Sequence, residues 1–219
     1  QGCPLRCQFC HNPDTWNMTD KNGATWRTAD ELLTQALRYR TYWRNGGGIT
    51  VSGGEPLLQI DFLLDLFKKA KAKGIHTTID TAGGPFTREE PFFSKFQDLM
   101  QYTDLLLVDI KHIDEKCHKE LTGKTNENIL DMIRYLSDIR KPIWIRHVLV
   151  PERSDCDEYL NRLNDFIQTL DNVERVEILP YHTLGAYKWK ELGLDYPLEG
   201  IHPPSRERVE NAKKILHCS

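Results

Sequence analysis

The sequence has no long apolar run and almost no excess of charge of one sign. No segment approaches the ~20 consecutive apolar residues that a membrane-spanning helix needs. The 219 residues carry a formal net charge of −3 at pH 7, which gives no reason to expect nucleic-acid binding. The chain also shows no secretory signal peptide, so we expect a cytoplasmic protein with no membrane or nucleic-acid partner.

Cysteine is absent from most of the chain. Three of the six cysteines lie within the first ten residues, none lies between Cys10 and Cys117, and Cys156 and Cys218 stand singly. This spacing is not typical of a disulfide framework, and cytoplasmic thiols stay reduced. The group at the beginning of the chain therefore indicates a metal site.

Short apolar segments, rich in β-branched residues and bounded by glycine, proline or charge, predict strands. The predicted strands are residues 48–52, 75–80, 104–110, 142–150 and 173–179. Helices are predicted from Thr28 toward Arg44, over 61–73, from Thr87 toward Tyr102, and over 125–140, 154–170 and 205–216, with a loop region over 188–204. This alternation predicts one α/β domain, residues 1–219, with a parallel sheet that is either open and doubly wound or part of a barrel.

The cysteine loop carries Cys3, Cys7 and Cys10 in the spacing C-x-x-x-C-x-x-C. Three thiolates so close together can each hold one corner of a 4Fe–4S cluster, whereas most electron-transfer clusters use four cysteines. Because no fourth cysteine is near, one iron would remain open to another ligand. The loop is therefore predicted to hold a cluster that does chemistry.

Other interpretations of the cysteine loop remain at this point. The string from Cys7 to His11 matches a haem attachment motif, but it leaves Cys3 unexplained. A structural zinc ion held by the three cysteines and His11 explains the loop alone. Free core thiols are the simplest alternative, although a polar loop is a poor place for them.

Charged and glycine-rich motifs follow the predicted strands. They are Ser52-Gly53-Gly54-Glu55-Pro56, Asp80-Thr81-Ala82-Gly83, Val108-Asp109-Ile110-Lys111, Trp144-Ile145-Arg146 and Leu179-Pro180-Tyr181-His182. Ligands gather at the carboxyl ends of parallel strands in α/β sheets and barrels. Together with the cysteine loop, these motifs resemble the radical S-adenosylmethionine (SAM) superfamily, and within it the pyruvate formate-lyase activating enzyme group.

The resemblance implies a fold and a reaction. The fold is an incomplete, TIM-like (β/α)6 barrel of parallel strands. Because the chain begins at Gln1 and not at methionine, we expect the first strand to precede the cysteine loop and to be missing from this sequence. The implied reaction is reductive cleavage of S-adenosyl-L-methionine at a 4Fe–4S cluster, which yields a 5′-deoxyadenosyl radical that removes a hydrogen atom from a glycine of pyruvate formate-lyase.

The resemblance also implies partners and site residues. Flavodoxin or ferredoxin would supply the electron under anaerobic conditions, and the absence of cysteine after Cys10 favours the single-cluster type. The cluster ligands would be Cys3, Cys7 and Cys10, and the cofactor would contact Phe9, His11, Gly53, Gly54, Glu55, Asp80, Asp109, Ile110, Lys111 and His182. The remaining histidines are expected to be structural or on the surface.

Arg146 is predicted to bind an anion for a reason that the residues themselves give. It shares a strand face with Trp144 and Val148, and burial of an unpaired charge is costly. The anion is either the carboxylate of the cofactor or a buried partner such as Asp109 or Glu177. Two alternatives to the activase function also remain: a radical SAM enzyme with another substrate, and a zinc-stabilised binding module.

Overall fold

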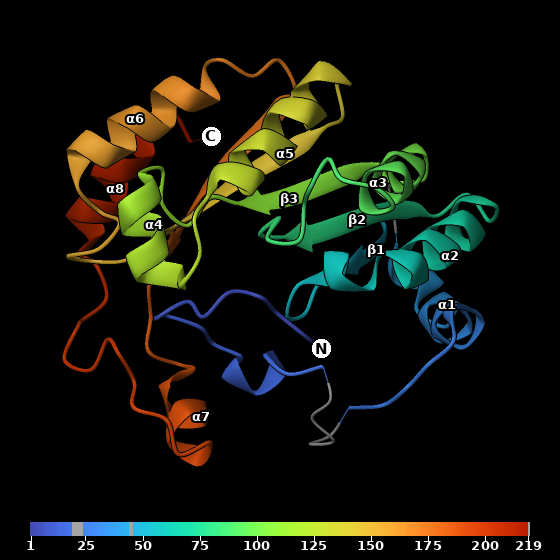
Figure 1. Ribbon diagram of the computed structural model, residues 1–219, viewed down its shortest axis with the longest axis horizontal. Coiled ribbons are helices and arrows are strands. Elements are labelled where there is room, and N and C mark those ends of the chain that lie inside the picture. The colour runs from blue at the N-terminus through green and yellow to red at the C-terminus, as the bar shows by residue number, and fades with distance from the viewer. Residues whose placement is uncertain (19–23, 44–45, 219) are drawn as a thin grey trace.

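The computed structural model describes residues 1–18, 24–43 and 46–218. Its five strands form one parallel sheet in the order β1-β2-β3-β4-β5 (Figure 1). They are β1 (Gly48–Val51), β2 (His76–Thr81), β3 (Leu105–Asp109), β4 (Ile143–Leu149) and β5 (Val173–Pro180). All five predicted strands are therefore confirmed. The sixth strand expected from the family fold is not among the described residues.

The strand order decides between the two predicted types of sheet. Each strand pairs with the next strand of the sequence, in parallel, from β1 to β5. Because crossovers between parallel strands are right-handed, an order that never reverses places the connecting helices on one face. A doubly wound sheet needs a reversal. The sheet is therefore wound as an open, incomplete barrel, with its other face free for a site.

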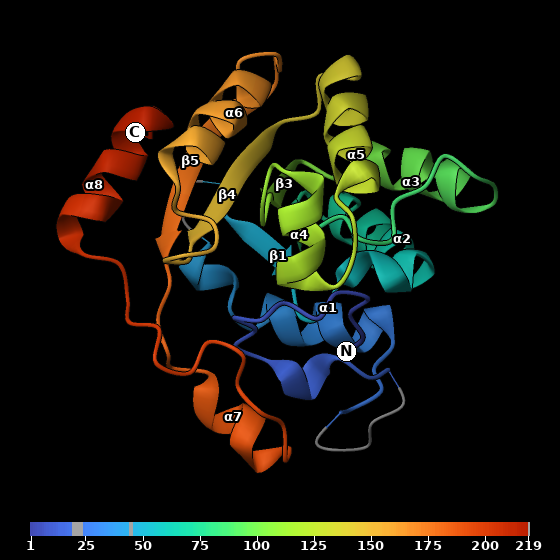
Figure 2. The ribbon, with the colours of Figure 1, turned by 60° about the vertical axis from the view of Figure 1, so that its left-hand side comes forward.

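Most of the helices cover the outer face of this sheet, whereas α7 (Ala186–Glu191) lies away from it, beside the N-terminal segment (Figures 1 and 2). The other helices are α1 (Ala29–Leu37), α2 (Ile60–Lys71), α3 (Phe92–Gln101), α4 (Glu115–Thr122), α5 (Glu127–Asp138), α6 (Asp157–Ile167) and α8 (Arg206–Ile215). The predicted capping box is present, since Thr28 and Glu31 bond reciprocally at the beginning of α1. No helix in the described ranges is long and apolar enough to cross a membrane.

The helix predictions were wrong in four places. No helix was predicted over α4, although Asp114 caps its beginning and Gly123 ends it in the left-handed conformation. Helix α7 begins at Ala186, where no helix was predicted, and runs into the predicted loop region 188–204. Helix α3 begins only after Pro91, because the segment from Thr87 forms turns. Helix α1 ends at Leu37, short of the predicted end at Arg44, which itself lies outside the described residues.

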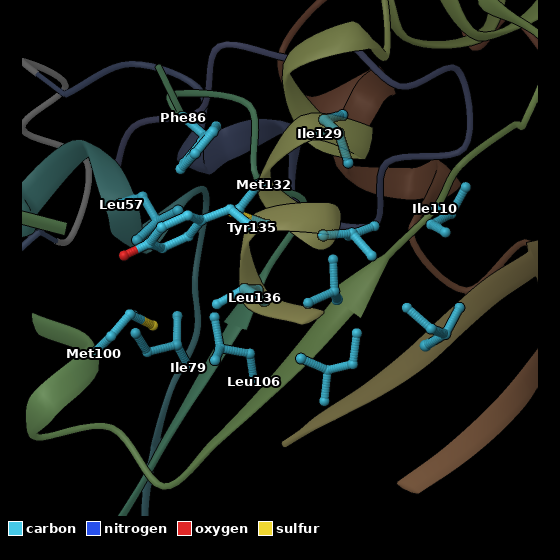
Figure 3. Close-up of a cluster of buried hydrophobic side chains, with 14 of the residues drawn as sticks. Leu57, Ile79, Phe86, Met100, Leu106, Ile110, Ile129, Met132, Tyr135 and Leu136 are labelled. Atoms are coloured by element: carbon cyan, nitrogen blue, oxygen red, sulfur yellow. The ribbon is translucent and has the colours of Figure 1, made fainter. Parts of the chain in front are cut away.

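Alternation along β4 shows how the sheet separates core from site. Ile143, Ile145 and Leu149 are fully buried, whereas Arg146 and Val148 are only half-buried. Figure 3 shows the buried side, where side chains of α5 pack onto Ile79 and Leu106 of the sheet. Since alternate residues face opposite sides, the half-buried residues lie on the inner face.

Candidate active site

The cysteine loop and the carboxyl ends of the strands surround one cavity of about 570 Å³. The predicted site residues that line it are Cys3, Cys7, Cys10, Phe9, His11, Gly53, Gly54, Asp80, Asp109, Lys111, Arg146 and His182. Residues from far apart in the sequence therefore meet at one place. Two predicted residues, Glu55 and Ile110, do not line the cavity.

Helix α4 holds the middle of the cysteine loop. The backbone N–H groups of Arg6 and Gln8 donate to the carbonyls of Thr122 (2.7 Å) and Leu121 (2.9 Å). The Gln8 side chain adds a bond to the Glu120 carbonyl at 2.9 Å. The last carbonyls of a helix have no partner within it, so these donors satisfy groups that would otherwise be unpaired. The helix that the sequence did not reveal therefore positions the cysteine loop.

The turn after β1 holds the beginning of the loop. The N–H of Glu55 donates to the carbonyl of Gly2 at 2.6 Å. A Cβ at Gly54 would lie 2.1 Å from that same oxygen, so only glycine allows this approach. Gly53 adopts φ +141, a conformation that L side chains rarely adopt. Both glycines are thus explained by the backbone path around the cavity.

The Glu55 side chain points away from the cavity into the protein. Its carboxylate accepts hydrogen bonds from Thr81 Oγ1 (2.6 Å), Ala82 N (3.0 Å) and Leu57 N (3.1 Å). Burial raises the pKa of Glu55, although these three donors oppose the rise. Glu55 therefore joins the glycine turn to the end of β2, and its geometry does not support a direct contact with the cofactor.

His11 and His182 form one wall of the cavity. Their rings stack with centroids 4.1 Å apart, and His11 Nε2 lies 3.1 Å from the carbonyl oxygen of His182. Burial lowers the pKa of His11, so the neutral ring is favoured. The first and last segments of the site are thereby joined by two aromatic faces.

The three thiols are partly or wholly removed from water. Burial raises the pKa of Cys3 and Cys10, and it raises that of Cys7 to about 12. The positive charge of Lys111 opposes the rise at all three. Its Nζ lies 5.4 Å from the centroid of the Phe9 ring. Lys111 therefore supplies the nearby cation that favours thiolates at a metal site.

Four charged side chains form a network at the strand ends. Lys111 Nζ lies 2.7 Å from Asp109 Oδ2, and Arg146 Nε lies 3.0 Å from Asp109 Oδ1. Arg146 Nη2 also pairs with Asp80. Burial alone would raise the pKa of Asp109, but Lys111 and Arg146 lower it below its usual value. At Asp80, burial and the negative charge of Asp109 raise the pKa, although Arg146 and Lys111 oppose the rise.

This network answers the question of which anion faces Arg146. Asp109 is the buried partner that the sequence offered as an alternative, and Asp80 is a second one. Glu177 pairs with Arg175 instead, at 3.2 Å. Ile110 is fully buried, and its N–H donates to the carbonyl of Arg146 at 3.0 Å. Ile110 thus braces the strand that carries Arg146 and does not reach the cavity.

The donor geometry tests what the cysteine loop can hold. Within the described residues, no group of three or more Cys, His, Asp or Glu side chains converges on the position of a single metal ion. His11 Nε2 is engaged with a carbonyl and not with the thiols. A zinc site needs four ligands around one point, whereas each thiolate of a 4Fe–4S cluster binds a different iron. Three separate thiols around an open cavity therefore fit a cluster better than zinc.

Comparison with known proteins supports this geometry. A model of the radical SAM superfamily matches residues 1–163. The pyruvate formate-lyase-activating enzyme of Streptococcus mutans is 56% identical over 217 residues, which are 99% of this chain and 82% of that protein. The chain belongs to the radical SAM superfamily, in the family of the pyruvate formate-lyase-activating enzymes. Such enzymes use a 4Fe–4S cluster and S-adenosylmethionine, so the predicted cofactors are those of the family.

Two further relatives of this radical SAM chain agree with the assignment. The pyruvate formate-lyase-activating enzyme of Listeria monocytogenes is 54% identical over 220 residues, which are 100% of this chain and 88% of that protein. The crystal structure of a domain of a pyruvate-formate lyase-activating enzyme from Bacteroides vulgatus superposes with a TM-score of 0.63 and 28% identity, over 78% of this chain and 94% of that one. The incomplete barrel is therefore shared with a solved member of the family.

Sequence reasoning missed several residues of this candidate site. Trp16, Thr81, Val148 and Tyr181 also line the cavity. Val148 and Tyr181 could have been predicted, because Val148 lies two residues after Arg146 on the same strand face and Tyr181 precedes His182. Trp16 lies beyond the cysteine motif, and no pattern in the sequence marks it. The buried histidines His112, His118 and His147 lie outside the lining of the cavity, as expected for structural residues.

Proposed function

We propose that this chain activates pyruvate formate-lyase by forming a glycyl radical in it. The observation that carries the proposal is the single cavity in which three separated thiols face a cradle of strand-end residues. When bound, the cluster and S-adenosylmethionine supply a reductive cleavage whose 5′-deoxyadenosyl radical removes a hydrogen atom from a glycine Cα of the partner. The protein contributes binding, orientation and exclusion of side reactions.

The chain's own residues divide this work among them. Cys3, Cys7 and Cys10 would hold the cluster, with Lys111 favouring their thiolate forms. Gly53, where a Cβ would face open space, leaves room for the cofactor, and Gly54 allows the close contact of this turn with Gly2. These assignments follow from the lining of the cavity and from the family motifs.

The remaining walls of the cavity suit the other parts of the cofactor. The stacked rings of His11 and His182, with Phe9 nearby, offer aromatic surface for the adenine. The strand-end network of Asp80, Asp109, Lys111 and Arg146 would face the charged amino-acid part. Arg146 acts within this network by holding both aspartates, so its effect on the cofactor is through their placement as well as its own charge.

A reductant is also part of the proposal, because the cluster must receive an electron before it acts. We propose a small electron carrier, flavodoxin or ferredoxin, and a cytoplasmic, anaerobic setting. Reduced thiols, which the described cysteines are, suit that compartment.

Anaerobic reconstitution with iron and sulfide tests the proposal. We expect ~4 Fe per chain and a brown chromophore. Addition of S-adenosylmethionine, reductant and pyruvate formate-lyase should then give a glycyl radical signal in electron paramagnetic resonance. Uptake of zinc without iron would show a binding module instead. Formation of 5′-deoxyadenosine without the glycyl signal would show a radical SAM enzyme with a different substrate.

A further inference from the structure

Two side chains hold the carbonyl oxygens of the first and the last cysteine of the loop. Arg6 Nη1 donates to the carbonyl of Cys3 at 2.7 Å and to that of Leu5 at 2.8 Å. Trp189 Nε1 donates to the carbonyl of Cys10 at 2.9 Å. Side chains therefore orient the peptide groups that follow Cys3 and Cys10. One of the two side chains, Trp189, lies far from the cysteine loop in the sequence.

The same two side chains meet on the ring of Trp16. The guanidinium carbon of Arg6 lies 4.9 Å from the centroid of that ring. The Trp189 ring meets it edge to face, with centroids 5.0 Å apart and an angle of 90° between the planes. The carbonyl of Trp16 also accepts a hydrogen bond from the N–H of Cys3 at 3.1 Å. The cation–π contact of Arg6 with Trp16 and the edge-to-face contact of the two tryptophan rings are both attractive in proteins.

Helix α7 brings Trp189 to this place. Lys188 Nζ contacts Asn12 Oδ1 at 2.7 Å and Asp14 Oδ1 at 3.1 Å, so α7 is fastened to the segment that follows the cysteine loop. A Cβ at Gly185 would lie 2.5 Å from the Cα of His11, which shows how closely the two segments approach. Figures 1 and 2 both place α7 beside the N-terminal segment.

We propose that Arg6, Trp16 and Trp189 form a bracket that fixes the spacing of Cys3 and Cys10 and so preorganises the loop for its cluster. This inference rests on the proposed function, because the Arg6–Trp16–Trp189 bracket would hold two of the three proposed cluster ligands in place. Its members are positioning residues that act through the cysteines. Groups that hold the ligands of a metal site commonly control how well the metal is kept.

The alternative is that the rings of Trp16 and Trp189 only fill space. Trp189 is buried and also packs against Tyr196, with centroids 5.5 Å apart. Trp189→Phe removes the indole N–H together with part of a buried ring, so either explanation allows it to loosen the cysteine loop. Arg6 is exposed, so Arg6→Gln changes the donor without leaving a buried void. A change of the loop in Arg6→Gln therefore separates the bracket from simple space filling.

The first experiment uses the cluster-free protein and hydrogen exchange. The amides of Cys3 and Cys10, which donate to Trp16 and Cys7, report on the loop. In Trp189→Phe and in Arg6→Gln we expect these amides to exchange about fivefold faster, the effect of losing one hydrogen bond. The controls are Trp26→Phe, at a tryptophan that is 87% exposed, and Arg206→Gln, at an exposed arginine of α8.

The second experiment uses the reconstituted protein and a chelator. Cluster loss should be several-fold faster in both variants and unchanged in both controls. Arg6→Lys should rescue the loss only in part, since one ammonium cannot reproduce the planar fork that reaches two carbonyls. The double variant should lose the cluster less quickly than the product of the single effects predicts, because both side chains act through Trp16.

Unchanged amide exchange and unchanged cluster loss in Trp189→Phe and Arg6→Gln would overturn the bracket. Changes of the same size in the two controls would overturn it as well. If the wild-type protein takes up no iron, the proposed function fails, and the exchange experiment on the cluster-free protein still decides whether the bracket orders the loop.

Discussion

Asp109 and Arg146 lie directly opposite each other on β3 and β4, and Arg146 Nε donates to Asp109 Oδ1 at 3.0 Å. Residues opposite each other in a parallel pair point to the same face of the sheet. The register between β3 and β4 therefore brings Asp109 and Arg146 together on the inner face, at the mouth of the cavity. The side chains of Arg146 and Asp109 are only 16% and 12% exposed, so neither charge is well hydrated without the other.

Arg146→Leu should weaken S-adenosylmethionine binding without removing the cluster. It removes the charge that holds Asp80 and Asp109 in place, and breaking a buried pair of this kind costs about 3 kcal/mol of stability. Calorimetric titration of the reconstituted protein, with iron content as the control, measures both effects. Arg146→Lys should lie between wild type and Leu, and unchanged affinity in the Leu variant would contradict the role given to Arg146.

Glu55→Gln should destabilise the fold by about 2 kcal/mol, although the two side chains have nearly the same shape. Both carboxylate oxygens accept from backbone N–H groups, Oε1 from Leu57 and Oε2 from Ala82. Either orientation of the amide turns its NH₂ toward one of these donors. Urea denaturation measures the loss. Glu89→Gln, at an exposed glutamate, is the control and should leave stability unchanged.

Gly54→Ala should impair both folding and cluster retention. The new Cβ would lie 2.1 Å from the Gly2 carbonyl oxygen, and backbone must move to relieve that overlap at a cost of about 2–3 kcal/mol. Gly74→Ala is a matched control, because Gly74 has φ +66 but open space around a Cβ. Thermal unfolding should show a smaller loss there, with normal retention of the cluster. Equal cluster loss in both variants would argue against a specific contact with the loop.

Acid should destabilise the protein through His112. Burial lowers the pKa of His112 to about 4, from an ordinary value of 6.5. Between these pH values His112 is protonated in the unfolded chain but not in the folded protein, so stability falls as the pH decreases. The loss from this group amounts to at most about 3 kcal/mol. His112→Asn should flatten the dependence of unfolding free energy on pH between 6.5 and 4. A slope as steep as that of wild type would assign the effect to other groups, such as His118 and His147, whose pKa burial also lowers.

Much of the fold was predictable because its signals are local. The five strands are short apolar runs with clear boundaries, and all five are present. The helices with an apolar stripe were also found within a few residues of their ends, apart from the beginning of α3 and the end of α1. Helix α4 was missed because it is short and polar outside, although Asp114 and Gly123 mark its two ends.

The sequence by itself determined the chemistry of the cysteine loop and of the strand-end motifs. Three closely spaced cysteines and glycines or charges that follow strands are patterns within a few residues, and parallel strands bring their ends together in any sheet of this type. That is why most of the predicted site residues line one cavity.

Only the tertiary structure decided which groups hold that site in place. The partners of Arg146 come from β2 and β3, the middle of the cysteine loop rests on α4, and its last carbonyl receives Trp189 from α7. The strand order likewise chose an incomplete barrel over a doubly wound sheet. These contacts join residues far apart in the chain, and no local pattern records which distant side chain will satisfy a given charge or carbonyl.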